Sequence, residues 1–147
     1  MKKDCPKSIV EIRDVVFSRD AKPIFDGLNI NIPRGKITAV MGPSGTGKTT
    51  LLSAIAGTLR VEAGEVNVFG KPLHSMPSGA LTRFRASNIG FIFQQFNLLS
   101  YAKVIDNILL PLHFSKQRSQ NVKNPITAAE NLCSALRLPD RIKSMQA

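Results

Sequence analysis

The sequence predicts an α/β fold in which strands come first, a glycine-rich loop with its helix follows, and helices dominate the second half. Three observations support this. Early in the chain, apolar and polar residues alternate with the period of two that is typical of strands. A glycine-rich run at residues 42–47 lies between an apolar segment and a helical one. From about residue 94 onward, apolar residues recur at helical spacing.

The first predicted elements are two half-exposed strands. Val10 and Ile12 alternate with charged neighbours, and residues 18–23 form a turn. A second strand follows around Ile30, where aliphatic residues alternate with asparagines. It ends at residues 33–36, where proline and glycine stand as a tight turn prefers.

Two short apolar segments are predicted as strands, and the first is expected to be buried on both faces. Residues 37–41, ITAVM, are apolar except for one threonine, and residues 89–93, IGFIF, carry no polar side chain. Strands inside a parallel sheet have this composition because both of their faces are covered. A further alternating strand is expected at Val66 and Val68, closed by Gly70.

A buried helix is predicted directly after the glycine-rich run. Residues 49–56, TTLLSAIA, place apolar side chains on several sides, and Gly57 is the expected helix cap. Residues 71–88 are interpreted as a loop and a short basic helix.

Two more helices are expected in the second half. Apolar residues repeat along one side of residues 104–112, with Pro111 as a break or kink. A polar stretch then leads to a last helix, which a capping box of Thr127 and Glu130 begins and Pro139 ends.

Composition favours one domain, or part of one, without a membrane span. The chain has 147 residues, 43% of them apolar, and no apolar run approaches the roughly 18 residues that cross a bilayer. The two cysteines, Cys5 and Cys133, suggest reduced thiols and a cytosolic protein. Twenty basic against ten acidic residues give a charge of +10, but they form no basic run with interleaved aromatics, so nucleic acid is not the expected partner.

The glycine-rich run fits the pattern G-x-x-x-x-G-K-[ST], in which backbone N–H groups and the start of a helix hold phosphate oxygens. We predict a phosphate-binding site at Gly42, Pro43, Ser44, Gly45, Thr46, Gly47, Lys48 and Thr49. Lys48 would reach the β- and γ-phosphates of ATP, and the Thr49 hydroxyl would bind Mg²⁺. Thr50 adds a hydroxyl near the α-phosphate. The alternative is a glycine-rich turn that holds no ligand.

Two long stretches, residues 28–73 and 89–112, resemble the amino-terminal part of the ATP-binding subunit of ABC transporters. The resemblance extends from about Val10 to Leu138 and implies a truncated P-loop NTPase of the ABC type. It further implies a strand-rich subdomain with the P-loop core over about residues 1–93. The Q-loop and the start of a helical subdomain would occupy about residues 94–147.

The resemblance also implies roles for two residues outside the loop. Gln94, or its neighbour Gln95, matches the Q-loop glutamine that contacts Mg²⁺ and the attacking water. Arg19 stands where the family places an aromatic side chain that stacks on adenine, and a guanidinium plane is able to stack in its place. Without the resemblance, the glutamines are a polar strand end, Arg19 is a solvated turn charge and Phe17 is a core residue.

The expected function follows from the same resemblance. The chain would bind ATP and Mg²⁺ for an ABC system that exports substrates or moves lipids or lipoproteins. It would lie on the inner face of the plasma membrane with a permease subunit and a second ATPase subunit. The sequence contains no Ser-Gly-Gly signature and no Asp-Glu pair closing an apolar strand, and neither His74 nor His113 suits the switch position. The alternative is therefore a truncated module that binds ATP without hydrolysing it.

Overall fold

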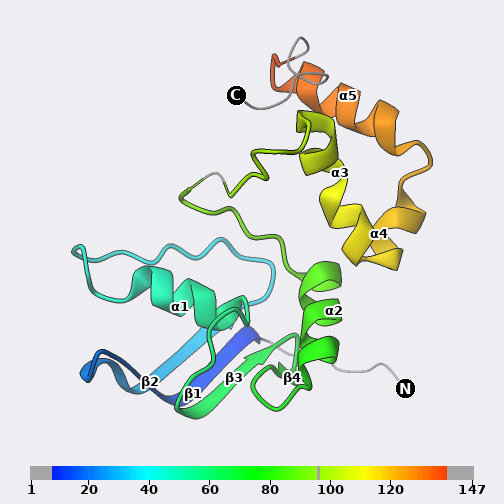
Figure 1. The fold of residues 1–147 in the computed structure, drawn as a ribbon. Helices are drawn as coiled ribbons and strands as arrows, with labels where there is room; N and C mark the ends of the chain where they lie inside the picture. The colour runs from blue at the N-terminus through cyan, green and yellow to red at the C-terminus, as the bar shows by residue number, and fades with distance from the viewer. Residues whose placement is uncertain (1–7, 96, 139–147) are drawn as a thin grey trace, which may run out of the picture. The chain divides into compact units, whose positions relative to one another are not determined.

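The computed structural model describes residues 8–95 and 97–138, in which four strands and one helix precede a run of four helices (Figure 1). The contacts divide the chain into two compact units, Met1–Leu81 and Thr82–Ala147. The elements are β1 (Ser8–Arg19), β2 (Lys22–Pro33), α1 (Lys48–Ile55), β3 (Ala63–Val68), β4 (Lys71–Pro72), α2 (Ser78–Asn88), α3 (Val104–Phe114), α4 (Lys116–Asn121) and α5 (Pro125–Ala135). The boundary between the units falls inside α2.

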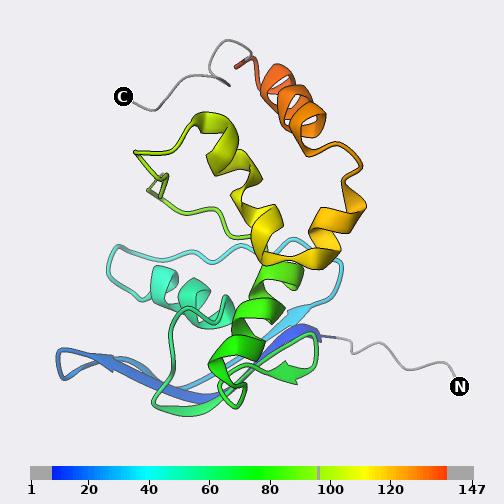
Figure 2. The same cartoon turned by 45° about the vertical axis from the view of Figure 1, so that its right-hand side comes forward.

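The first unit is an antiparallel sheet with one helix across it. The strand order is β2-β1-β3-β4, so β1 is flanked on both sides. Ile12 pairs with Ile30 on β2 and with Val66 on β3, and it is only 2% exposed. In Figures 1 and 2, α1 lies over one face of this sheet. The predicted alternation in the first two strands and at Val66 is confirmed.

The hairpin between β1 and β2 is tighter than predicted. Arg19 pairs with Lys22, which leaves Asp20 and Ala21 as the loop. Both have positive φ, 52° and 60°. Positive φ at both residues is typical of the two-residue hairpin turn whose twist matches that of the paired strands. Glycine is the residue that usually occupies the second position.

The two strands predicted from apolar segments are absent from the described part of the chain, and this prediction is wrong. Residues 37–41 and 89–93 belong to no helix or strand. Ile37 is 102% exposed, Met41 89% and Ile92 98%. An apolar run becomes a central strand only when neighbouring strands pair with both of its edges. Within residues 8–95 and 97–138, no strand pairs with either segment.

The second unit contains the predicted helices, with differences in detail. The helix predicted at residues 104–112 is confirmed as α3, but it continues through Pro111 to Phe114, so proline does not break it. The polar stretch predicted as a linker contains the short helix α4, capped by Ser115, whose hydroxyl accepts from the Arg118 N–H at 3.3 Å.

The start of α5 differs from the capping box predicted at Thr127 and Glu130. Asn124, not Thr127, is the N-cap, and its Oδ1 accepts from the Thr127 N–H at 3.2 Å. Asparagine is at least as good an N-cap as threonine, and Pro125 fixes a helical φ at the first position. Thr127 thus occupies the position at which a capping box would require glutamate or glutamine. Pro139, expected to end this helix, lies outside the described residues.

Candidate phosphate-binding site

The glycine-rich run forms a loop that leads directly into α1. Gly47 is the N-cap, with φ 86°, and its carbonyl accepts from the Leu51 N–H at 2.8 Å. No side chain of the described residues caps this helix end, and the first turn contains no acidic residue. The N–H groups of the first turn have no partner within a helix, and the helix dipole places partial positive charge there. The end of α1 therefore suits an anion such as phosphate.

Lys48 directs its ammonium group back over the loop. Its Nζ donates to the carbonyl oxygens of Gly42 at 2.8 Å and Pro43 at 2.5 Å. The Thr46 hydroxyl also donates to the Pro43 carbonyl, at 2.9 Å. These bonds hold a positive charge within the concave side of the loop, close to the first turn of α1. The structure thus brings Lys48 and the carbonyl of Gly42 together, and phosphate binding by the loop remains a prediction.

The loop is anchored on the sheet through Gly47. A β-carbon added at this position would lie 2.6 Å from Cγ2 of Ile24 and 3.1 Å from Cε1 of Phe25, both on β2. Phe25 is 8% exposed and therefore part of the core. Glycine at residue 47 allows the start of α1 to approach the strand closely, which fixes the loop relative to the sheet.

The two threonines after Lys48 face different surroundings. Thr49 is exposed, so its hydroxyl is accessible to a metal ion that is also bound to nucleotide phosphates. Thr50 is 8% exposed and lies on the buried side of α1 with Leu51 and Ala54. A contact of Thr50 with the α-phosphate remains a prediction.

Arg19 stands at the end of β1, next to the hairpin loop, and is exposed. Both ribbon views place this hairpin at the same end of the first unit as the glycine-rich loop (Figures 1 and 2). Phe17, two residues earlier, pairs with the buried Phe25. Stacking of Arg19 on a base remains a prediction.

Gln94 and Gln95 belong to the second unit. Both are exposed and lie outside helices and strands, directly after the contacting rings of Phe91 and Phe93, whose centroids are 4.6 Å apart. Their surroundings leave the amide groups accessible to a ligand. A Mg²⁺ or water contact of Gln94 remains a prediction.

Sequence reasoning missed the role of Asn107. Its Oδ1 accepts from the Leu99 N–H at 2.8 Å, and its Nδ2 donates to the carbonyls of Leu99 at 3.1 Å and Lys103 at 3.1 Å. The side chain thereby ties the loop that precedes α3 to the helix. The available signal was one amide among the apolar residues of α3, since a polar group at such a site usually has hydrogen-bond partners.

A glycine-rich loop whose lysine lies back over it, followed by an uncapped helix on a sheet, is typical of P-loop proteins. The family model for "ABC transporter" matches residues 25–146, which is most of the chain. The chain therefore belongs to the ABC transporter family.

Individual relatives agree with this assignment. The chain is 41% identical over 105 residues to the intermembrane phospholipid transport system ATP-binding protein MlaF of Escherichia coli, covering 71% of this chain and 39% of MlaF. It is 39% identical over 106 residues to the methionine import ATP-binding protein MetN of Rhizobium etli, covering 72% of this chain and 29% of MetN. The chain thus spans well under half the length of these relatives.

A solved structure supports the same fold. The dimeric ABC transporter cassette MJ0796 superposes with a TM-score of 0.77 at 26% identity, covering 93% of this chain and 61% of that one. Another structure of MJ0796 is of a post-hydrolysis state bound to ADP and Pi. The α/β fold of ABC type predicted from the sequence is confirmed. Across the described part of the chain, none of the helices is long and apolar enough to span a bilayer.

Proposed function

We propose that this chain binds MgATP through residues 42–49, as the nucleotide-binding part of an ABC transporter ATPase that powers lipid movement or export. The observation that carries the proposal is the geometry of the loop. The Lys48 ammonium lies over the loop, 2.8 Å from the Gly42 carbonyl, beside the uncapped first turn of α1. Cation, dipole and backbone donors all favour the same ligand, a polyphosphate.

Each residue of the site has a distinct task in this proposal. The first-turn N–H groups hold phosphate oxygens, and Lys48 exchanges its carbonyl partners for the β- and γ-phosphates. The exposed Thr49 hydroxyl supplies one oxygen to Mg²⁺, which neutralises phosphate charge when bound. Gln94 would contact the same ion, and Arg19 would stack on adenine.

ATP affinity tests the loop directly. In calorimetric titrations with MgATP, Lys48→Ala should reduce affinity at least tenfold, since a hydrogen bond to a charged group contributes about 1.5–3 kcal/mol. Lys36→Ala is the matched control, because it removes an equal charge from an exposed residue outside the loop. Unchanged affinity in Lys48→Ala, or an equal loss in Lys36→Ala, would show that the loop is not the site.

The magnesium role has its own test. Thr49→Val removes the hydroxyl while it keeps the shape of the side chain, and Thr49→Ser keeps the hydroxyl. We expect Thr49→Val to abolish the gain in ATP affinity that Mg²⁺ gives, and Thr49→Ser to retain it. A full magnesium effect in Thr49→Val would remove this residue from the metal site.

The transport role rests on the similarity to MlaF, whose name describes phospholipid transport. We propose a membrane permease and a second ATPase subunit as partners, on the inner face of the plasma membrane. A tagged chain expressed from its native locus should sediment with membranes, release at alkaline pH as a peripheral protein does, and co-purify with an integral membrane protein. Recovery of the chain only in the soluble fraction, without a membrane partner, would contradict this.

A further inference from the structure

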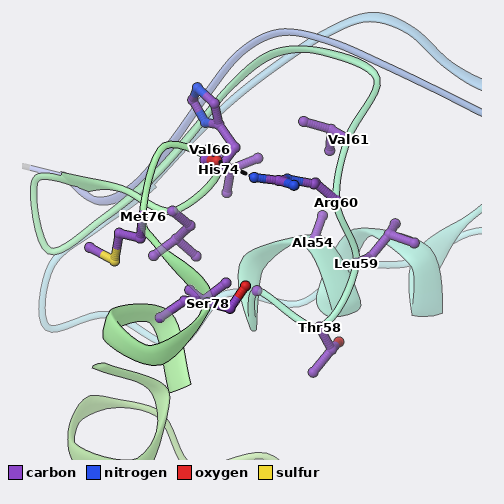
Figure 3. A pocket seen from close by; sticks show the side chains of 12 residues that line it. Ala54, Thr58, Leu59, Arg60, Val61, Val66, His74, Met76 and Ser78 are labelled. Carbon is purple, nitrogen blue, oxygen red and sulfur yellow. Dashed lines mark hydrogen bonds between the residues drawn. The ribbon is translucent and has the colours of Figure 1, made fainter. Parts of the chain in front are cut away.

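A pocket of about 160 Å³ opens at the C-terminal end of α1, the opposite end of the helix from Lys48 (Figure 3). Its apolar wall includes Ala54 on α1, Val66 on β3 and Leu73, which are 2%, 3% and 3% exposed. Because these side chains are fixed in the core of the first unit, the wall is rigid and already formed. The pocket therefore requires little rearrangement to accept a ligand.

Among the described residues that line the pocket, Arg60 is the one Lys or Arg. Its Nη2 donates to the His74 carbonyl at 3.2 Å, which holds the guanidinium in place (Figure 3). The His74 Nδ1 is buried without a partner among the described residues, but in Figure 3 the ring points away from the guanidinium. The carbonyl is thus the group of His74 that orients Arg60.

The guanidinium has no carboxylate partner among the described residues. None of the twelve residues that line the pocket is acidic. Glu62, two positions along the chain, directs its carboxylate elsewhere, where it accepts from the Ser18 N–H at 2.8 Å. A guanidinium has five N–H donors in a planar fork, and one bond to a carbonyl leaves most of them available to an acceptor.

We propose that this pocket binds a small carboxylate whose body is a short apolar group of about six carbons. The volume sets the size, since an apolar cavity of about 150 Å³ holds one benzene molecule. The half-buried side chains of Leu59, Val61 and Met76, which also line the pocket, would contact the apolar body, and the Arg60 guanidinium would pair with the carboxylate. One guanidinium balances the single charge of a carboxylate, whereas the second charge of a phosphate dianion would find no further Lys or Arg among the described residues that line the pocket.

Benzoate is the probe, with benzyl alcohol and benzylammonium as neutral and cationic ligands of similar size. Each is titrated into the full chain at low salt while the methyl resonances of Val66 and Leu73 are followed by NMR. We expect benzoate to bind most tightly and benzylammonium least. Arg60→Gln should weaken benzoate about two- to fivefold, the range for an exposed ion pair, and should leave benzyl alcohol unchanged.

Arg34→Gln is the matched control, because it removes the same charge from an exposed arginine that does not line the pocket. It should leave benzoate binding unchanged. Absence of methyl shifts with benzoate would overturn the proposal. Equal affinity for the three ligands would also overturn it, because Arg60 would then give the pocket no preference for an anion. An equal loss in Arg34→Gln would overturn it as well, because benzoate would then respond only to the net charge of +10. No outcome depends on nucleotide binding, so the test is separate from that of the phosphate loop.

Discussion

Replacing Gly47 by alanine should destabilise the phosphate loop through two separable effects. The residue has φ 86°, and a left-handed conformation costs an L-amino acid about 1–2 kcal/mol. The new methyl group would also lie 2.6 Å from Ile24 Cγ2 and 3.1 Å from Phe25 Cε1. Overpacking of this kind costs about 1–3 kcal/mol. We expect Gly47→Ala to lower the free energy of unfolding by about 2–5 kcal/mol in urea titrations followed by circular dichroism.

Gly45 provides the matched control within the same loop. Its φ is 83°, nearly that of Gly47, but an added β-carbon would meet nothing within 4 Å. Gly45→Ala should therefore cost only the backbone contribution, about 1–2 kcal/mol. Adding Ile24→Ala to Gly47→Ala should recover part of the loss, measured against Ile24→Ala alone. Equal losses at the two glycines, without recovery in the double variant, would refute the packing argument.

Three further substitutions test other parts of the structure by the same unfolding measurement. Ala21→Gly should stabilise the chain by about 1 kcal/mol because glycine tolerates φ 60°, whereas Ala21→Val should destabilise it. Asn124→Ala should lower the free energy of unfolding by about 1 kcal/mol, because it removes the N-cap, and Thr127→Ala should lower it less. A larger loss in Thr127→Ala would favour the predicted capping box. Asn107→Ala should cost about 1–3 kcal/mol and speed hydrogen exchange at the Leu99 N–H, while unchanged exchange would contradict its anchoring role.

Local patterns predicted the elements that local interactions determine. The alternation around Ile12 identified β1, because a strand with one buried face must place apolar residues at every second position. The glycine-rich pattern at residues 42–49 identified the loop and the start of α1. The loop needs glycines because several of its residues have positive φ, and the last of them, Gly47, is the N-cap of the helix. The turn at residues 18–23 was predicted, but its tight two-residue loop at Asp20 and Ala21 was not, because glycine is missing from the usual position.

Predictions that depended on distant partners were less successful. The apolar composition of residues 37–41 and 89–93 indicates a preference for burial, but pairing requires strands from elsewhere, which the segment itself does not specify. The pocket beside Arg60 combines residues from α1, β3, α2 and two loops, so no short pattern predicts it. The two residues of β4 are too few for any periodicity to appear.

The hydrogen bonds of Lys48 have a consequence for the energetics of its ligand. Because Nζ already donates to the Gly42 and Pro43 carbonyls, contact with a phosphate replaces existing bonds instead of adding new ones. The net contribution of Lys48 to the free energy of phosphate binding is therefore the difference between two sets of charged hydrogen bonds. The same lysine is also a cross-link between the two ends of its own loop. Its removal should therefore loosen the backbone that holds the remaining donors, and substitutions elsewhere in the loop should not be additive with it.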